Sequence, residues 1–346
     1  MDIYVMNKNF EKIALIEDAS TIWAKRYYDV GDFEIFVGAT EEYINILQKG
    51  NYITRLEDDS VGIIESIKTT YDEEGTEYLT VSGRFAESIL ERRIVWTQTR
   101  LSGTAENGLR NLVNNNIINP IIADRKIPII ELGPIKGYTD RLDAQYTGDN
   151  ILQINKDVAK SNQTGFRFNL VEKETGFKFA YELYKGIDRS YNQNINPYVV
   201  FSDKYDNLLS SENELNIANL KNVALVAGEG EGTARKTATV GSVAGLDRYE
   251  TFVDAKDLST NNGEISVSEY NKALNEKGLE NLVTITQTFS GEVDLQQNYK
   301  YKEDFFLGDI VTIENSKWGI YINARIIEII ESEDESGYKI TPTFGI

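Results

Sequence analysis

The sequence predicts an α+β fold that is mainly β, with two similar small β-barrels, an inserted α+β domain and a short helical insertion. Short runs rich in β-branched and aromatic residues, separated by Gly, Asp or Asn, occupy both ends of the 346-residue chain. Helical spacing of apolar residues is concentrated between those ends. A β-element near residues 63–83 also returns near residues 326–345.

The first hundred residues are predicted to form the first barrel. Runs such as DFEIFVG and NYITRLED have the length and composition of strands. The segment YDEEGTEY reads as a hairpin loop, in which Gly75 supplies the positive φ that the turn needs. Short strands at this spacing are typical of a small barrel or sandwich, so we assign the first barrel to residues 1–100.

Residues 101–196 are predicted to form the inserted α+β domain. Thr104 is placed to cap one helix, and a second helix is expected within residues 147–165. A β-hairpin that turns across residues 174–176 follows this helix. Two helices followed by a hairpin indicate a compact unit of ordinary domain size.

Residues 197–240 and 284–346 are predicted to form the second barrel. Residues 241–283 between them are predicted to be an insertion with one helix. Ser268 is its expected cap, and Gly278 is expected near its end.

The returning β-element suggests a duplication. Ile63–Gly83 and Ile326–Gly345 share an isoleucine pair, a glutamate, an acidic turn and a tyrosine before a Thr-rich strand, and the lead-ins GNYITRL and GDIVTIE also match. Identity is low, so two unrelated hairpins remain the alternative. In a cyclic trimer, duplicated barrels would give six near-equivalent units that can dock on a six-fold ring. A monomer with two barrels around a ligand cleft is the other arrangement.

The composition excludes several classes of chemistry. With 36 basic and 55 acidic residues, the formal charge is −19, which opposes binding to nucleic acid and anionic lipid. The chain has no Cys and no His, which excludes disulfides, thiolate metal sites and Ser-His-Asp or Cys-His catalysis. The sequence shows neither a signal peptide nor an apolar run that could span a bilayer. We expect folding in the cytoplasm without membrane insertion.

The sequence contains only weak candidates for catalysis or metal binding. The Gly-rich VAGEGEGTARKT lacks the strand–loop–helix context of a phosphate loop and is predicted to be a hairpin tip. Glycosidase chemistry needs paired carboxylates in a cleft, whereas these runs are predicted to lie in solvated turns: Asp58-Asp59, Glu73-Glu74 and Glu333-Asp334-Glu335. We predict no catalytic, cofactor-binding or metal-binding residues and no enzymatic activity.

Arg92, Arg93 and Trp96 form the one candidate interface in the sequence. Arginine pairs with carboxylates and stacks on rings, so this group suits a contact between acidic subunits. The alternative is an exposed helix end whose cations face the negative end of the helix dipole. Trp23 and Trp318 are predicted to fill barrel cores or rims rather than to bind sugar.

Sequence blocks across nearly the whole chain resemble the Gp37-like tail proteins of siphoviruses, which are similar to the baseplate-hub family of contractile phage tails. In order, these blocks are IALIEDASTIWAKRYYDVGDFEIFV, TVSGRFAESILERRIVW, GLDRYETFVDA, FFLGDIVTIENSKWGIYINARIIEIIES and TPTFG. The resemblance implies a homotrimeric hub built on two barrels. Its expected partners are a hexameric tail-ring protein of the distal tail or tube, a spike or fibre protein, and DNA that passes without specific binding.

The expected function is therefore structural. The resemblance implies a tail-tip or baseplate hub that adapts the six-fold tail tube to a three-fold spike or fibre, located in the virion tail and assembled in the bacterial host cytoplasm. Many relatives carry an enzymatic or fibre domain after the hub, so we expect such an activity on another chain here. Two alternatives stay open: a cell-wall glycosidase using Asp/Glu carboxylates, and a carbohydrate receptor-binding tail module.

Overall fold

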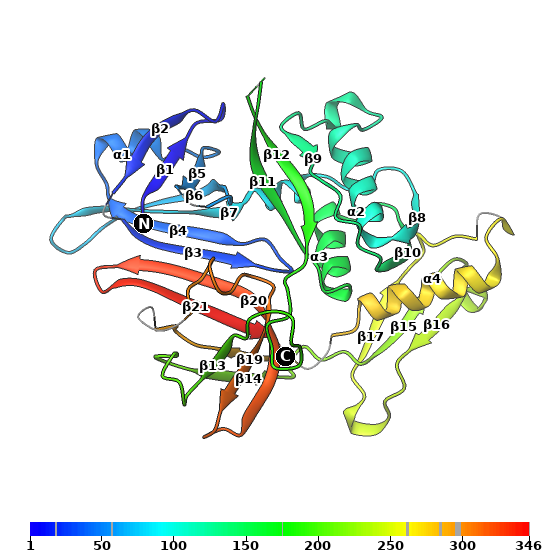
Figure 1. Cartoon of the computed structure of the whole chain (residues 1–346). Coiled ribbons are helices and arrows are strands. Elements are labelled where there is room, and N and C mark those ends of the chain that lie inside the picture. Colours follow the sequence, from blue (N-terminus) through cyan, green and yellow to red (C-terminus); the bar gives the residue numbers. More distant parts are fainter. Residues whose placement is uncertain are drawn as a thin grey trace.

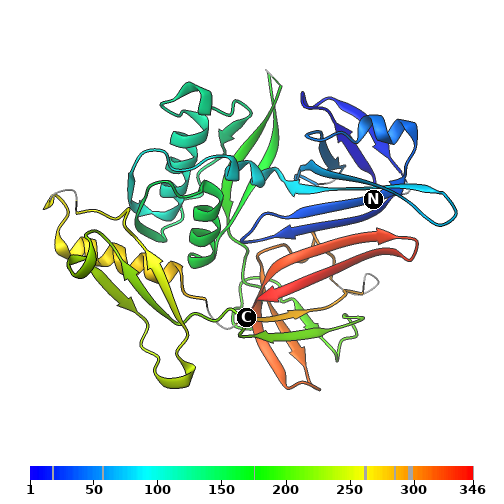
Figure 2. The same cartoon turned by 180° about the vertical axis from the view of Figure 1, so that it is seen from behind.

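The structure, a computed structural model, describes residues 1–17, 19–56, 58–174, 176–260, 263–283, 286–294 and 299–345. The fold is mainly β, as predicted, and the largest sheet among these residues has 13 strands. Segments from the two ends of the chain lie side by side in it, with the blue β3 and β4 beside the red β20 and β21 in both views (Figures 1 and 2).

The large sheet runs in the order β14-β18-β21-β20-β3-β4-β7-β6-β5-β1-β2, and β19 and β13 extend it beside β20. The strands of its N-terminal half are β1 (Ile3–Met6), β2 (Lys12–Ile16), β3 (Ser20–Arg26), β4 (Asp32–Gly38), β5 (Tyr52–Arg55), β6 (Gly62–Tyr71) and β7 (Glu77–Phe85). Those of its C-terminal half are β13 (Val200–Ser202), β14 (Glu212–Asn216), β18 (Thr286–Ser290), β19 (Ile310–Asn315), β20 (Ile320–Asp334) and β21 (Gly337–Gly345). Helix α1 (Glu41–Ile46) connects β4 to β5.

The predicted pair of closed barrels is not confirmed, because none of the sheets among the described residues closes on itself. The length of β20 explains how the two halves join. Ile320–Arg325 of β20 pair with β19, and Glu328–Glu333 pair with β3 along the same edge of β20. The N-terminal half therefore completes the sheet of the C-terminal half.

The two halves repeat one order of neighbouring strands. The order is β3-β4-β7-β6-β5 in the N-terminal half and β14-β18-β21-β20-β19 in the C-terminal half, and every pairing is antiparallel. The matched segments Ile63–Gly83 and Ile326–Gly345 fall on corresponding hairpins, β6–β7 and β20–β21. Outside these five strands the halves differ, because β1 pairs antiparallel with β5 whereas β13 pairs parallel with β19.

Backbone hydrogen bonds at the two hairpins correspond as well. The amide of Gly50 donates to the carbonyl of Ile64, and the amide of Gly308 donates to the carbonyl of Ile326, each at 2.9 Å. Both glycines have a positive φ, +84° and +95°. The register of each hairpin then shifts by one residue directly after Ile64 and after Ile326, as a β-bulge does. Ile64 and Ile326 therefore occupy equivalent positions.

The helices and hairpin between the two halves are confirmed. Helix α2 (Ala105–Val113) begins after Thr104, whose hydroxyl accepts from a backbone amide, and α3 (Ile151–Ser161) is capped in the same way by Asn150. The hairpin pairs β11 (Gly165–Lys173) with β12 (Gly176–Tyr184), and Thr175 of its predicted turn lies outside the described residues. The other strands here are β8 (Thr99–Thr104), β9 (Ile130–Leu132) and β10 (Arg141–Tyr146).

A small α+β unit stands apart from the large sheet (Figure 1). Its strands β15 (Val223–Ala227), β16 (Thr237–Val240) and β17 (Glu250–Asp254) form a separate sheet covered by α4 (Val267–Glu280). The unit is inserted between β14 and β18, where the N-terminal half has only the short turn between β3 and β4. The predicted cap Ser268 is wrong, because the N-cap is Ser266, two residues earlier, which forms a capping box with Glu269.

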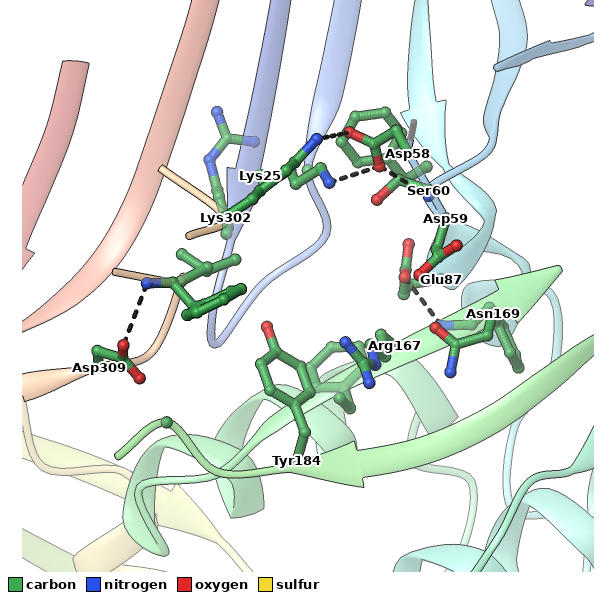
Figure 3. A pocket seen from close by; sticks show the side chains of 18 of the residues that line it. Lys25, Asp58, Asp59, Ser60, Glu87, Arg167, Asn169, Tyr184, Lys302 and Asp309 are labelled. Atoms are coloured by element: carbon green, nitrogen blue, oxygen red, sulfur yellow. Dashed lines mark hydrogen bonds and ion pairs between the residues drawn. The ribbon is translucent and has the colours of Figure 1, made fainter. Parts of the chain in front are cut away.

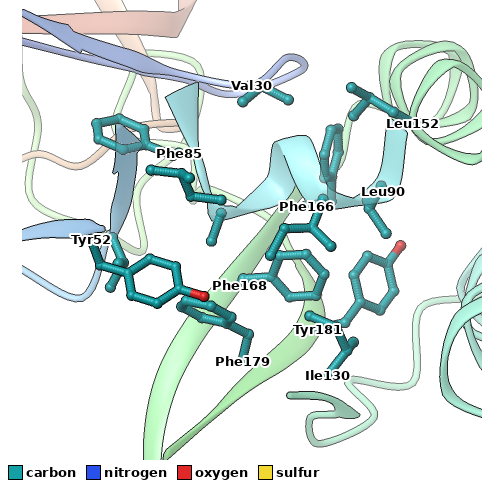
Figure 4. Close-up of a cluster of buried hydrophobic side chains, with 14 of the residues drawn as sticks. Val30, Tyr52, Phe85, Leu90, Ile130, Leu152, Phe166, Phe168, Phe179 and Tyr181 are labelled. Atoms are coloured by element: carbon teal, nitrogen blue, oxygen red, sulfur yellow. The ribbon is translucent and has the colours of Figure 1, made fainter. Parts of the chain in front are cut away.

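Three hydrophobic cores support these layers. The largest joins the N-terminal half to the α+β region, and Figure 4 shows Tyr52 and Phe179 within it. There Phe10 stacks on Tyr52 with ring centres 4.7 Å apart, and Phe179 packs against both rings. The second lies under the C-terminal half and the third under α4. Helices α2 and α3 and the β11–β12 hairpin therefore share a core with one half of the large sheet. The domain boundaries given above stay predictions.

Candidate functional site

The joint between β3 and β20 is the feature that distinguishes this fold from two independent sheets. It contains six antiparallel pairs, from Arg26 opposite Glu328 to Thr21 opposite Glu333. Its inner side lies against buried aromatic and charged side chains, and its outer side faces solvent. Both sides of the joint together form the candidate functional region.

On the inner side, one buried carboxylate holds three cations. Lys25 Nζ lies 2.5 Å from Asp58 Oδ1, and Lys302 Nζ lies 3.3 Å from Asp58 Oδ2 (Figure 3). Asp58 Oδ2 also lies 2.6 Å from Arg55 Nη2. The Asp58 side chain is 0% exposed. Lys25 belongs to β3, Arg55 ends β5, and Lys302 precedes β19. The carboxylate therefore ties the two halves of the chain together.

Arg55 extends this charged cluster to the β20–β21 hairpin. Its Nη2 also donates to Glu331 Oε2 at 2.5 Å, and Glu331 Oε1 accepts from the Tyr338 hydroxyl at 2.6 Å. The guanidinium lies over the buried ring of Trp23 at 4.9 Å. Charges buried in this way are stable only as a set, because the loss of one partner leaves another charge uncompensated.

Burial and neighbouring charges act in opposite directions on the pKa values of this cluster. Burial alone would raise the pKa of Asp58, but the attraction of Lys25 and Arg55 outweighs it and holds that pKa well below its usual range. Burial would lower the pKa of Arg55, yet Glu331 and Asp58 raise it. Burial lowers the pKa of Lys25 in spite of Asp58. Arg55 and Asp58 are therefore the most firmly ionised members of the cluster.

A cavity of about 560 Å³ borders the cluster. Its walls come from β3, the β11–β12 hairpin and the segment before β19, and Figure 3 shows the side chains that face it. Glu87 on this wall accepts a hydrogen bond from the amide of Phe168 at 2.9 Å, and burial raises the pKa of its carboxyl. One carboxyl of raised and one of lowered pKa resemble an acid–base pair. Both oxygens of Asp58, however, already contact cations.

On the outer side, two arginines of the large sheet are neutralised. Arg26 Nη1 lies 2.5 Å from Asp32 Oδ2, and Arg26 Nε lies 2.7 Å from Glu328 Oε1. Arg84 on β7 lies 2.9 Å from Glu65 and 2.7 Å from Glu91. Each guanidinium thus has two carboxylate partners. These two cations are already paired, which does not favour their binding to phosphates.

Of the predicted interface residues, Arg92 ends a short 3₁₀ helix, Ala86–Arg92, and Arg93 and Trp96 follow it. Arg93 Nε donates to the carbonyl of Arg125 at 2.7 Å, and the Arg125 guanidinium lies over the Trp96 ring at 5.0 Å. Arg92 is exposed, and Trp96 is 58% exposed. Arg93 and Trp96 thus share Arg125 as a neighbour, and the role of the three predicted residues in an interface stays a prediction.

The prediction of solvated carboxylates is wrong for one residue. Glu73 and Glu74 are exposed on the β6–β7 loop, as expected, but the Asp58 side chain is buried. The run EDD gave no hint of this burial, because the three cations come from distant segments. A weak signal was nevertheless present, since Lys25 directly follows the apolar run Ile22–Ala24 and Glu331 directly follows two isoleucines. Trp23 lies in the core as predicted, whereas Trp318 is 49% exposed.

The other candidate segments are connections. The Gly-rich stretch connects β15 to β16, which pair antiparallel, so it is a hairpin connection as predicted. Within the described residues, no group of three or more Asp, Glu, His or Cys side chains lies close enough together to hold a metal ion. None of the helices in this part of the chain is long and apolar enough to cross a membrane.

Two tail proteins of known structure share the fold. The 43 kDa tail protein of prophage MuSo2 from Shewanella oneidensis gives a TM-score of 0.57 at 12% identity, over 99% of this chain and 98% of that chain. The tail protein from Neisseria meningitidis MC58 gives 0.56 at 12% identity, over 100% and 96%. At such identity the likeness concerns the fold alone. No curated protein sequence gives a significant match.

A family model covers the chain almost from end to end. It describes the Siphovirus ReqiPepy6 Gp37-like protein and matches residues 2–346. Both halves of the large sheet and everything inserted between them lie inside the match. The chain therefore belongs to the family of Siphovirus ReqiPepy6 Gp37-like proteins, in agreement with the resemblance of its sequence blocks.

Proposed function

We propose that this protein is a structural component of a phage tail tip or baseplate, in which three copies form a ring between a six-fold tail tube and a three-fold spike or fibre. The family match and the two tail proteins that share its fold support the tail assignment. The observation that carries the ring is the repeated strand order of the two halves.

The mechanism is geometric. Two similar halves joined edge to edge in each chain give six similar units in a trimer, which can match a hexameric tail-ring protein on one face. The parts that are not repeated, the α+β region and the α4 unit, keep the other face three-fold for a spike or fibre protein. The two halves take the place of the two barrels that the sequence led us to expect.

The ring would enclose a passage for DNA. The paired arginines Arg26 and Arg84 on the solvent side of the large sheet support a lining that does not retain phosphates. The formal charge of −19 acts in the same direction. In this proposal DNA passes without specific binding, and the protein assembles into the virion tail in the host cytoplasm.

Light scattering after size-exclusion chromatography tests the assembly, with and without the tail-ring protein of the same phage. We expect the mass of a trimer in the presence of that ring. A monomer in isolation would be compatible with template-driven assembly. Absence of the protein from assembled tails would overturn the proposal.

The cavity beside Glu87 and Asp58 favours one rival, a cell-wall glycosidase. In that case Glu87 would be the acid and Asp58 the second carboxylate. Incubation of the purified protein with host cell walls separates the two functions. Release of sugar that Glu87→Gln abolishes, without loss of folding, would establish the enzyme. We expect no release.

A further inference from the structure

We infer that the ring is closed by β14 of one copy pairing with the free edge of β6 in the next copy, in the antiparallel register of the β3–β20 joint. This inference rests on the proposed trimer and names the surface that forms it. The occupant of each edge is a second copy of this chain.

Both strands have an unpaired edge among the described residues. β6 pairs with β7 along its length, but its other edge meets β5 only at Gly62 and Ile63. The segment Ser66–Tyr71 is mostly exposed. β14 pairs with β18 alone, and all of its residues, Glu212–Asn216, are exposed. Free edges of this kind are templates for pairing with another chain.

The chain already contains the joint that these edges would form. By the shared strand order, β6 corresponds to β20 and β14 corresponds to β3. Within one chain, β3 fills the edge of β20 beyond its bulge. The free edge of β6 is the equivalent of the β20 edge that β3 fills, and β14 is the equivalent of β3. These two lie toward opposite ends of the same sheet. Such head-to-tail contacts generate closed rings when the rotation per unit divides the circle.

The register follows by counting from equivalent positions. On β6, Ile64 corresponds to Ile326, so Ile67 corresponds to Ile329. From Ile64 the paired residues across the sheet are Gly83, Phe33 and Trp23 in turn. From Ile326 they are Phe344, Phe289 and Asn213. Asn213 on β14 is therefore equivalent to Trp23 on β3. Leu215 therefore takes the place of Lys25.

In the joint, Lys25 is directly opposite Ile329. Between copies, Leu215 therefore falls opposite Ile67, and Glu214 falls opposite Lys68. Leu215 is 63% exposed and Ile67 is 40% exposed, so each has apolar surface for the other to cover. The register thus unites one apolar pair and one pair of opposite charge, the combinations that stabilise neighbouring strands.

A shift by one residue would destroy this match. Glu214 would then face Ile67 or Thr69, and every side chain would turn to the other side of the sheet. The joint itself carries a comparable ion pair, since Arg26 lies opposite Glu328 and their side chains contact at 2.7 Å. A lysine on a free edge also deters aggregation. That role accounts for Lys68 but not for the exposed Leu215.

Disulfide trapping tests the register directly, because the native chain has no cysteine. Directly opposite residues have Cβ atoms about 4.5 to 5.5 Å apart, so a small shift of the strands brings them to the roughly 4 Å of a disulfide. We expect Lys68→Cys combined with Glu214→Cys to give a covalent closed trimer on mild oxidation of the full chain under the conditions in which the native chain trimerises, alone or with the tail-ring protein. The matched control, Ile67→Cys with Glu214→Cys, places the two thiols on opposite faces and should give none.

A charge exchange provides a second measurement that needs no oxidation. Lys68→Glu should raise the concentration needed for trimer formation at least tenfold, and addition of Glu214→Lys should restore it. Lys49→Glu, which changes an exposed lysine outside both strands, should leave assembly unchanged. Failure of the double exchange to restore assembly would count against the pairing.

The outcomes separate this inference from the proposed function. If the native chain forms trimers, alone or in tails, and the cysteine pair does not trap them, the register is wrong and the ring stands. Equal cross-linking of both cysteine pairs also rejects the register. If trimers are found neither in solution nor in assembled tails, the proposed function fails with it.

Discussion

Arg55 on β5 and Glu331 on β20 are 276 residues apart in sequence, yet they form a buried ion pair with 2.5 Å between Nη2 and Oε2. Arg55 reaches Asp58 with the same nitrogen, and Glu331 reaches Tyr338 with its other oxygen. The first half of the chain thus supplies the cation that the second half needs. The two halves should consequently unfold as one cooperative unit.

Glu331→Gln should destabilise the protein by roughly 3 to 5 kcal/mol, since it leaves Arg55 with a weaker partner in a buried site. Urea unfolding at pH 7 measures this change. Glu250→Gln is the matched control, because it breaks the exposed pair with Arg248 and should cost less than about 1 kcal/mol. Similar costs for both variants would show that the joint does not depend on its buried charges.

Asp58 should make stability fall in acid. Its pKa in the folded protein is lowered from 3.8, so its contribution is present above about pH 4 and is lost as the pH falls below that value. Asp58→Asn should therefore be less stable than the native chain at pH 7, by about 2 to 4 kcal/mol. The difference should shrink between pH 4 and pH 2.5, as measured by urea midpoints. A constant difference would contradict the assignment.

Glu280 should act in the opposite direction. Burial beside Tyr146 raises its pKa from 4.5 to about 7, with Asp157 adding to the shift and Lys277 opposing it. The stability that this group contributes is therefore fully present below pH 4.5 and is lost as the pH rises through about 7. Glu280→Gln should stabilise the protein at pH 8 by on the order of 1 to 3 kcal/mol. Thermal melts at pH 5 and pH 8 test this, and an equal gain at both values would refute it.

The helix α4 gives a comparison of two serines. Ser266→Ala should cost about 1 kcal/mol, because Ser266 accepts from the Glu269 amide in the capping box. Ser268→Ala, two positions into the helix, should have little effect. Amide hydrogen exchange in the first turn of α4 measures both. Equal protection in the two variants would contradict the assigned cap.

Local signals in the sequence predicted most elements of the fold, and tertiary contacts account for what they missed. Thr104 and the turn at Gly75 were found because a cap and a positive φ depend on adjacent residues. The pairing of β3 with β20 depends on segments about 300 residues apart, so it left no local pattern. The burial of Asp58 has the same origin. The repeated hairpin was visible because its turn and strand residues follow one another locally in both segments.

Gly50 and Gly308 separate what the two halves share from what they do not. Both have positive φ and the same backbone hydrogen bond, so Ala at either site should cost about 1 to 2 kcal/mol for the backbone alone. A Cβ on Gly50 would meet only the end of Lys8 at 3.0 Å, whereas one on Gly308 would lie 2.3 Å from the ring of Tyr27.

Gly308→Ala should therefore lower the free energy of unfolding by at least about 2 kcal/mol more than Gly50→Ala does, because the buried Tyr27 ring must move. Urea unfolding measures both variants. Gly319→Ala, with φ +67° and open space around it, isolates the backbone contribution and should match Gly50→Ala. If Gly50→Ala and Gly308→Ala lower the free energy of unfolding equally, Tyr27 is not packed tightly against Gly308 of the C-terminal half. The expected inequality follows because the two halves share a backbone geometry, while only the second is packed against a neighbour within its own chain at this point.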